Sequence, residues 1–207
     1  MDLWGRMFAA GYDRFMAATE SAGLAHFRET LLSSASGRVL EIGGGTGANL
    51  PFYGRAVSEL VISEPEEPMA RRLESRVAER QVPTRVVRSP AEELPLEPRS
   101  FDCVVSTFAL CTVGDLDQAL AEVRRVLRPN GRLLFIEHVR SEDPKLARWQ
   151  DWLSRPWAWF AHGCQCNRAI VEAVQSSAFS VTELRHEEVP KSLPILRPLV
   201  IGTAVRN

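Results

Sequence analysis

No stretch of the sequence stays hydrophobic over the length that a membrane-spanning helix requires, about 18 residues. The N-terminal segment Met1–Phe15 also lacks the pattern of a cleaved signal sequence, because Asp2, Arg6 and Asp13 interrupt its apolar positions. We therefore expect a cytoplasmic protein without a transmembrane segment.

The sequence has no excess of charge of either sign. It contains 25 Lys and Arg residues against 26 Asp and Glu residues, a formal net charge of -1 at pH 7. Proteins that bind nucleic acid carry a strongly basic surface, because they neutralise phosphates. Nucleic acid is therefore not expected as a partner.

Cysteine is scarce, with four residues in the chain, which is too few for a disulfide framework. Cys103 and Cys111 fall within or just after a predicted buried strand, so a reducing compartment is expected. His162, Cys164 and Cys166 are spaced like the first half of a zinc site, but the sequence has no second C-x-x-C to complete one. We therefore expect no metal.

The chain does contain enough apolar residues for one substantial core, 45% of 207, so a single domain over residues 1–207 is predicted. Short apolar runs alternate with amphipathic stretches, which is the pattern of βαβ units. Parallel strands are predicted at Arg38–Ile42, Glu59–Ser63, Thr84–Arg88, Phe101–Ser106 and Arg132–His138. Crossover helices are predicted at Pro68–Arg80 and Asp115–Leu127.

Both ends of the chain depart from this alternation. Helical patterns at Leu3–Ala17 and Leu24–Leu32 predict a helical cap, residues 1–36, over the carboxyl edge of the sheet. After a helix that ends near Ser177, Phe179–Glu187 and Leu199–Val205 are predicted to form a hairpin at the edge of the sheet. The predicted fold is a Rossmann-like α/β sandwich with helices on both faces of the sheet.

A glycine-rich loop, Gly43-Gly44-Gly45-Thr46-Gly47, follows the first predicted strand and precedes a helical pattern. Glycines there allow a sharp turn and a close approach of the backbone to a nucleotide-like ligand. Gly43, Gly45 and Ala48 also match the dinucleotide fingerprint G-x-G-x-x-G/A, so the loop alone does not name its ligand.

Further features favour S-adenosylmethionine (SAM) over a dinucleotide. Glu41 stands two residues before Gly43, where a carboxylate suits the cationic ammonium group of SAM. Glu64 and Pro65 end the second strand about twenty residues later, the place of a ribose-binding acid in either kind of site. A polar turn at residues 89–95 follows the third strand, where it can border the adenine.

Residues 39–139 contain several motifs in a fixed order: V-L-E-I-G-x-G-T-G from Val39, E-P at Glu64, A-E-x-L-P from Ala91 followed by S-F-D, and E-V-x-R-V-L-R-P-x-G from Glu122. In this combination the chain resembles class I SAM-dependent methyltransferases of the ubiquinone-biosynthesis-like group. The resemblance implies a seven-stranded sheet whose last strand is antiparallel, in agreement with the predicted hairpin, and a SAM-binding core at residues 37–140.

The resemblance also implies which residues contact SAM. These are Gly43, Gly45 and Glu64, the Ala91 amide at the adenine, and Ser106 and Thr107 near the methionine moiety; with the motif positions around them the candidate set adds Glu41, Gly47, Pro65 and Glu92. One position departs from the pattern, because Pro90 stands where many relatives have an acidic residue that binds the adenine amino group. Glu92 or a backbone carbonyl is the expected substitute.

The residues that handle the methyl acceptor are sought in residues 141–207 and at the end of the fifth strand. Glu137 and His138 end that strand at the carboxyl edge, where ligands bind in open α/β sheets, so they are candidates for the general base. A histidine that only binds a neighbouring loop is the alternative.

Four of the five tryptophans fall between Arg148 and Phe160. Trp149, Trp152 and Leu153 share one face of a helix. Three interpretations remain open: the face packs on the sheet, it forms an aromatic wall around an apolar acceptor, or it lies in a membrane interface.

The segment around Cys164, Asn167 and Arg168 is similar to one in the thiol methyltransferases that associate with membranes, although we do not expect this chain to share their hydrophobic N-terminal anchor. The similarity suggests a small apolar thiol as acceptor, with Arg168 as a cation that favours the thiolate. A quinone or phenol, a phospholipid amine, and a SAM-binding protein without catalysis remain alternatives.

Overall fold

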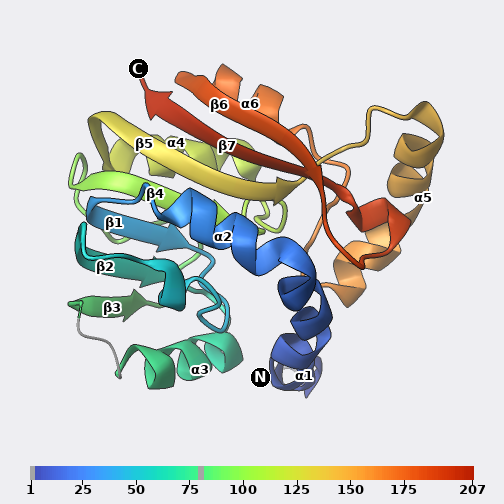
Figure 1. Cartoon of the computed structure of the whole chain (residues 1–207), viewed down its shortest axis with the longest axis horizontal. Coiled ribbons are helices and arrows are strands. Elements are labelled where there is room, and N and C mark those ends of the chain that lie inside the picture. The colour runs from blue at the N-terminus through green and yellow to red at the C-terminus, as the bar shows by residue number, and fades with distance from the viewer. Residues whose placement is uncertain (1–2, 79–81) are drawn as a thin grey trace.

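A computed structural model describes residues 3–78 and 82–207 (Figure 1). The strands are β1 (Gly37–Ile42), β2 (Val57–Ser63), β3 (Thr84–Val87), β4 (Phe101–Thr107), β5 (Leu127–His138), β6 (Phe179–Glu188) and β7 (Pro198–Arg206). The helices are α1 (Leu3–Thr19), α2 (Ala25–Leu32), α3 (Glu67–Val77), α4 (Leu116–Val126), α5 (Pro144–Phe160) and α6 (Ile170–Ser176). A π-helical turn, Glu20–Leu24, separates α1 from α2, and short 3-10 turns occur at Leu50–Phe52 and Pro194–Leu196.

The strands form one sheet in the order β3-β2-β1-β4-β5-β7-β6. β1 to β5 pair in parallel, and β7 is antiparallel to both β5 and β6. This confirms the Rossmann-like sheet with a C-terminal hairpin. The order reverses between β1 and β4, so the carboxyl ends of these two strands form the crevice in which open α/β sheets bind ligands.

Each face of the sheet has its own apolar core, because successive side chains of a strand point to opposite faces. In β5, Leu133 and Phe135 join the cluster under α4 and α6, whereas Leu134 and Ile136 join the cluster under α2 and α3. Helices thus cover both faces, as the near-continuous apolar strands predict.

Two helices agree closely with the sequence prediction. The Asp115 carboxylate accepts a hydrogen bond from the backbone N–H of Gln118 and caps α4. α3 starts one residue before the predicted Pro68 and ends at Val77; the predicted end at residues 79–80 lies outside the described residues.

The sequence predicted a helix directly after the glycine loop, and this prediction is wrong. Residues 45–49 form turns, closed by the hydrogen bond from Gly47 N to Gly44 O, and only the 3-10 turn follows. Positive φ angles at Gly45 and Gly47 interrupt any helical run here. The loop therefore presents turns rather than a helix N-terminus to the crevice.

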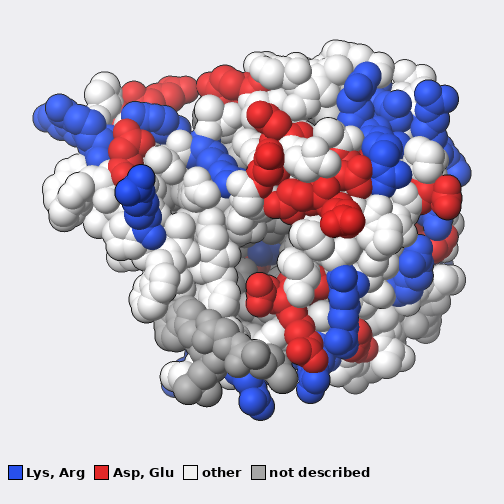
Figure 2. All heavy atoms as spheres, turned by 180° about the vertical axis from the view of Figure 1, so that it is seen from behind, with Lys and Arg blue, Asp and Glu red and all other residues white. Residues whose placement is uncertain are grey.

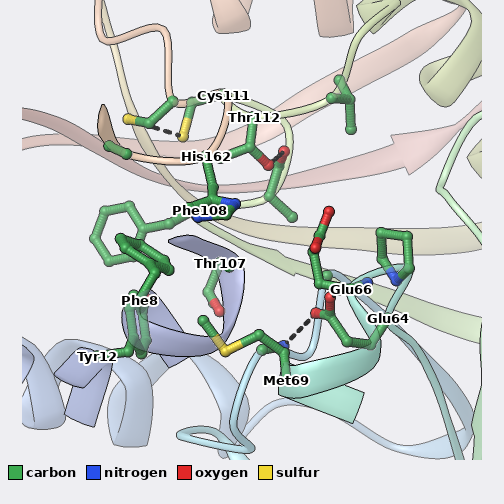
Figure 3. Close-up of a pocket in the computed structure, with 18 of the residues that line it drawn as sticks. Phe8, Tyr12, Glu64, Glu66, Met69, Thr107, Phe108, Cys111, Thr112 and His162 are labelled. Carbon is green, nitrogen blue, oxygen red and sulfur yellow. Dashed lines mark hydrogen bonds between the residues drawn. The ribbon is translucent and has the colours of Figure 1, made fainter. Parts of the chain in front are cut away.

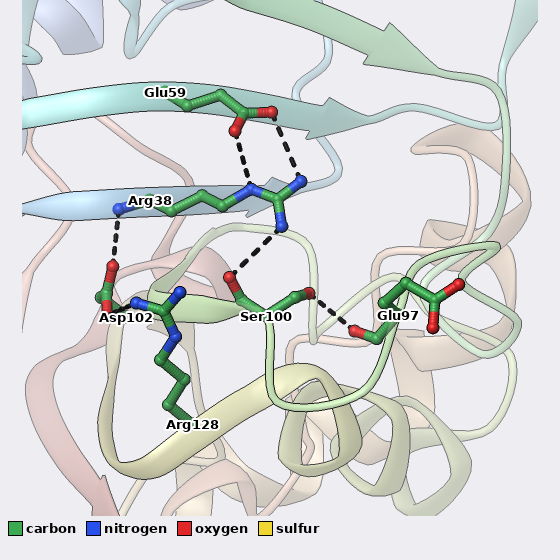
Figure 4. A network of polar contacts seen from close by, with 6 residues as sticks. All are labelled: Arg38, Glu59, Glu97, Ser100, Asp102 and Arg128. Atoms are coloured by element: carbon green, nitrogen blue, oxygen red, sulfur yellow. Dashed lines mark hydrogen bonds and ion pairs between the residues drawn. The ribbon is translucent and has the colours of Figure 1, made fainter.

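A polar network fixes the amino ends of the strands, at the edge opposite the crevice (Figure 4). The Arg38 guanidinium pairs with Glu59 at 2.8 Å, and the Arg38 backbone N–H donates to the Asp102 carboxylate, also at 2.8 Å. Arg128 pairs with the same carboxylate. Four neighbouring strands are thus joined at one end, away from the candidate site.

In residues 3–78 and 82–207 we find no helix that is both long and apolar enough to cross a bilayer. The four cysteines are free thiols, all of them buried.

Candidate active site

A cavity of about 530 Å³ opens at the carboxyl ends of β1, β2 and β4 (Figure 3). The glycine loop and the end of β2 form one side of it. The other side is formed by α1, the segment after β4, and the end of α5 with the residues that follow. Eight predicted site residues line it: Gly43, Gly45, Glu64, Pro65, Ala91, Glu92, Thr107 and Cys164.

The glycine loop leaves room for a ligand at one position in particular. Gly45 has φ +55°, and a Cβ atom added there would meet no protein atom within 4 Å. The backbone therefore faces open cavity space, which a nucleoside can approach closely. Gly43 differs, because a Cβ there would lie 2.6 Å from the Cβ of Ala109, so this glycine lets two loops pack together.

Glu64 is held in place by backbone groups at the end of β2. Its two carboxylate oxygens accept hydrogen bonds from Gly45 N at 2.7 Å and Glu66 N at 2.9 Å. Burial raises the pKa of this carboxyl above its ordinary value, although both hydrogen bonds oppose the shift. A carboxylate fixed beside the glycine loop is placed to accept from the hydroxyl groups of a ribose.

At the predicted adenine side, Pro90, Ala91 and Glu92 all line the cavity. The Glu92 carboxylate accepts hydrogen bonds from Gly114 N at 2.6 Å and Asp115 N at 3.3 Å. Glu92 thus joins this turn to the start of α4, and the position of Pro90 offers no side-chain acceptor.

Glu41 does not line the cavity, contrary to the expected contact with the SAM ammonium group. Its carboxylate accepts from Asn49 Nδ2 at 2.9 Å and from the Tyr53 hydroxyl at 2.7 Å. Arg28 of α2 donates hydrogen bonds to the Asn49 side chain and to the Thr107 hydroxyl. Nothing in the sequence pointed to this role for Arg28. Burial raises the pKa of Glu41 to about 7. This buried network shapes the floor of the glycine loop.

Aromatic side chains dominate the side of the cavity opposite the glycine loop. Phe8 lies between Tyr12 and His162, with ring centroids 5.5 and 4.4 Å away (Figure 3). Burial raises the pKa of Tyr12 to about 12, so its hydroxyl is neutral. The sequence predicted a helical cap here, but its residues gave no signal that three aromatic residues of that cap, Phe8, Tyr12 and Phe15, line the site.

Two thiols stand on the same side. Cys111 and Cys164 have their sulfur atoms 3.9 Å apart and both line the cavity. Their mutual hydrogen bond raises the pKa of Cys111 and lowers that of Cys164. Cys164 therefore lines the cavity, and its role toward the acceptor stays a prediction.

Glu137 is away from the cavity and holds the loop after β4. Its carboxylate accepts four hydrogen bonds: from the Ser106 hydroxyl at 2.6 Å and from the backbone N–H groups of Ala109, Leu110 and Cys111 at 3.0 to 3.1 Å. Because Glu137 does not line the cavity and is engaged in these bonds, we assign it a supporting role rather than one in proton transfer. Ser106, expected beside SAM, is likewise part of this support.

Arg168 supports the same loop from the other side. Its guanidinium donates to the carbonyl groups of Leu110 at 2.7 Å and Val113 at 2.5 Å. It does not line the cavity, so the expected cation beside a thiol acceptor is instead a clamp on the loop 107–113.

His138, the other candidate base, lies behind Phe108, with the two ring centroids 4.6 Å apart. Phe108 lines the cavity and His138 does not. Burial lowers the pKa of His138 to about 4, so the imidazole is neutral near pH 7. His162 is the histidine that faces the cavity (Figure 3).

The tryptophan-rich segment forms α5, but its tryptophans face different ways. Trp149 and Trp152 are 57% and 72% exposed and lie away from the cavity, so they neither pack on the sheet nor form its aromatic wall. Trp157 and Phe160, at the end of the helix, do line it. Gly47 is the remaining predicted residue that lies away from the cavity.

Comparison with known proteins agrees with this geometry. Residues 40–135 match a family described as a methyltransferase domain. The chain is 32% identical over 203 residues to thiol S-methyltransferase TMT1A of Homo sapiens, covering 96% of this chain and 83% of the relative. It is 35% identical over 122 residues to the ubiquinone/menaquinone biosynthesis C-methyltransferase UbiE of Hahella chejuensis, covering 56% and 49%.

Solved structures share the fold. A SAM-dependent methyltransferase of Thermotoga maritima, described as a possible histamine N-methyltransferase, superposes with a TM-score of 0.73 at 22% identity and full coverage of both chains. A geranyl diphosphate methyltransferase, solved with its substrate and sinefungin, superposes with a TM-score of 0.68 at 18% identity over 89% of this chain and 77% of that one.

The motif order, the cavity at the switch between β1 and β4, and the relative that the chain matches over four-fifths of its length lead to one assignment. The chain belongs to the family of SAM-dependent methyltransferases and takes S-adenosylmethionine as its methyl donor.

Proposed function

We propose that this enzyme methylates the sulfur atom of a small apolar thiol. The observation that carries the proposal is one continuous cavity, with the glycine loop and Glu64 on one side and a wall of aromatic rings and thiols on the other. The thiol S-methyltransferase activity of the relative TMT1A supports this choice of acceptor.

SAM fits the first side of the cavity. Gly43, Gly45 and Glu64 would hold the nucleoside, with Pro65, Ala91, Glu92 and Thr107 completing its surroundings. SAM supplies an activated methyl group on a sulfonium centre. The open space at Gly45 and the fixed carboxylate of Glu64 are what such a nucleoside requires.

The opposite wall suits an apolar body. Phe8, Phe108, Trp157 and Phe160 remove it from water and align its sulfur with the methyl donor, which is most of what a displacement of this kind needs. His138 and Glu137 do not line the cavity, so we assign neither of them the role of base. A thiol tolerates this, because with a pKa of about 8.5 a few per cent of it is already thiolate near neutrality.

His162 is the imidazole on the cavity wall, so we assign it, rather than His138, the assisting role in removing the thiol proton. Such help matters most at low pH, where solvent leaves the acceptor protonated.

The test is methyl transfer from labelled SAM to a panel that contains an apolar thiol, a phenol, a quinol and a phospholipid amine, with products identified by mass spectrometry. We expect the S-methyl product to dominate. Methylation of the phenol, quinol or amine with no S-methyl product would refute the thiol assignment while leaving the enzyme a methyltransferase.

A further inference from the structure

An outward face of α5 carries large apolar side chains that the cavity does not use. Trp149, Trp152 and Trp159 are 57%, 72% and 76% exposed, and the rings of the first two meet edge to face at 5.7 Å. Tryptophan is an unfavourable residue to leave in water, and its amphipathic ring is enriched at the headgroup depth of membranes.

The opposite face of the helix fixes this orientation. Ala147 and Gln150 are buried, and the Gln150 amide donates to the carbonyl groups of Val139, Cys166 and Ile195 at 2.9 to 3.1 Å. The helix is thus held to the protein by a specific polar contact, and the three tryptophans point outward as a result.

Cations share the tryptophan face. Lys145, Arg148 and Arg155 are exposed and recur with the tryptophans at spacings of three and four residues, so all six side chains lie on one side of the helix. The single acidic residue of α5, Asp151, is paired with Arg140 at 2.7 Å. Viewed from behind, Lys and Arg side chains project at the end that α5 forms, with acidic side chains among them, and further Lys and Arg side chains lie at the opposite end (Figure 2).

We propose that the face of α5 formed by Lys145, Arg148, Trp149, Trp152, Arg155 and Trp159, here called the tryptophan face, docks the enzyme on an anionic lipid bilayer. Aromatic rings enter the headgroup layer and the three cations meet anionic headgroups. A second copy of the chain is a poorer occupant, because a two-fold contact through this face would place like charges opposite one another.

Docking through the tryptophan face would bring the cavity close to the membrane. α5 ends in Phe160, which lines the cavity and is 43% exposed, and Met7 and Phe15 of α1 line it as well while remaining 59% and 62% exposed. The tryptophan face therefore adjoins an apolar cavity rim. If the proposed apolar acceptor is right, lipid-dissolved substrate reaches this rim without crossing water; the docking itself does not depend on that acceptor.

The test is co-sedimentation of the full chain with vesicles, in the absence of SAM and acceptor. Vesicles of phosphatidylcholine alone are compared with vesicles containing phosphatidylglycerol, with tryptophan fluorescence recorded in parallel. We expect binding and a blue shift with the anionic vesicles, weakened by added salt.

Two sets of variants test the face itself. Replacing Trp149, Trp152 and Trp159 together by Ser should abolish binding, and Arg148→Gln with Arg155→Gln should weaken it about fivefold for each charge removed. The matched control is Arg55→Gln with Arg124→Gln, two exposed arginines at the other end of the strands, which should leave binding unchanged.

Three results would overturn the proposal: no binding of the native chain to anionic vesicles, equal binding by the triple Ser variant, or a dimer in analytical ultracentrifugation that the triple Ser substitution dissolves. Since every measurement is made without methyl transfer, failure here is distinguishable from failure of the thiol assignment.

Discussion

The buried carboxyl of Glu41 and the buried imidazole of His138 should affect stability with opposite dependence on pH. The pKa of Glu41 rises from 4.5 to about 7 on folding. Folding therefore takes up a proton between these pH values, and the stability present below pH 4.5 is lost as the pH rises to about 7. Between pH 5 and pH 8 this amounts to a loss of about 2 to 3 kcal/mol.

His138 acts in the other direction. Its pKa falls from 6.5 to about 4 on folding, so the native state favours the neutral ring and loses stability as the pH falls through this range. Between pH 5 and pH 8 it should contribute a gain of about 2 kcal/mol. The two contributions nearly cancel in the native protein.

Single substitutions should separate them. Glu41→Gln keeps an acceptor for Asn49 and a partner for the Tyr53 hydroxyl but removes the titration. The free energy of unfolding, measured in urea at pH 5 and pH 8, should then rise with pH by about 2 to 3 kcal/mol relative to the native protein. His138→Asn should make it fall by about 2 kcal/mol on the same comparison.

Burial also raises the pKa of Glu64 and Glu137, but both are present in all three proteins and drop out of the differences. An unchanged difference between native protein and Glu41→Gln at the two pH values would refute the reasoning, because Glu41 would then titrate alike in the folded and unfolded chain.

Other predictions concern the cofactor and the acceptor. Gly45→Val should abolish SAM binding, because the branched side chain fills the open space and opposes the φ of +55°; native affinity in a folded variant, measured by calorimetry, would contradict the loop assignment. Glu64→Ala should weaken SAM by about 1 to 3 kcal/mol in the same titration, and an unaltered Kd would move the ribose site elsewhere. His162→Asn should lower the turnover of a thiol far more at pH 6 than at pH 9, with His138→Asn as control; equal pH profiles for both variants would exclude a proton-transfer role for His162.

The sequence predicted the fold well, because parallel strands buried on both faces and an N-capped helix are local patterns. Glu64 and Ala91, which follow strand ends, line the cavity, since the carboxyl ends of parallel strands meet at one edge. Their contact with SAM stays a prediction. Strand position alone does not say what a polar side chain meets. Glu137 and His138 sit at the expected edge, yet one supports a loop and the other lies behind Phe108.

The packing of segments that are far apart in the sequence could not be predicted either. Helical spacing grouped Trp149 with Trp152 but did not reveal whether that face is covered, which depends on Gln150 and its three distant carbonyl partners. Phe8 and Tyr12 of α1 line the cavity. The helical patterns predicted a cap over this edge of the sheet, but not which of its side chains face the site. The absence of a helix after the glycine loop has a local cause, because Gly45 and Gly47 adopt positive φ angles. The G-x-G-x-x-G/A pattern does not reveal these angles.

The two sides of the cavity are held by different polar contacts. The loop 107–113 is held by hydrogen bonds that its backbone donates to the Glu137 carboxylate and accepts from the Arg168 guanidinium. α1, by contrast, is tied to the loop and to α3 through Asp13, whose partners are the Thr46 hydroxyl and a half-exposed Arg76, and exposed ion pairs of this kind add little stability. We therefore expect ligands to enter and leave the cavity by displacement of α1, while the loop 107–113 stays in place. Amide hydrogen exchange should accordingly be faster in α1 than in the loop 107–113, and SAM should slow it there.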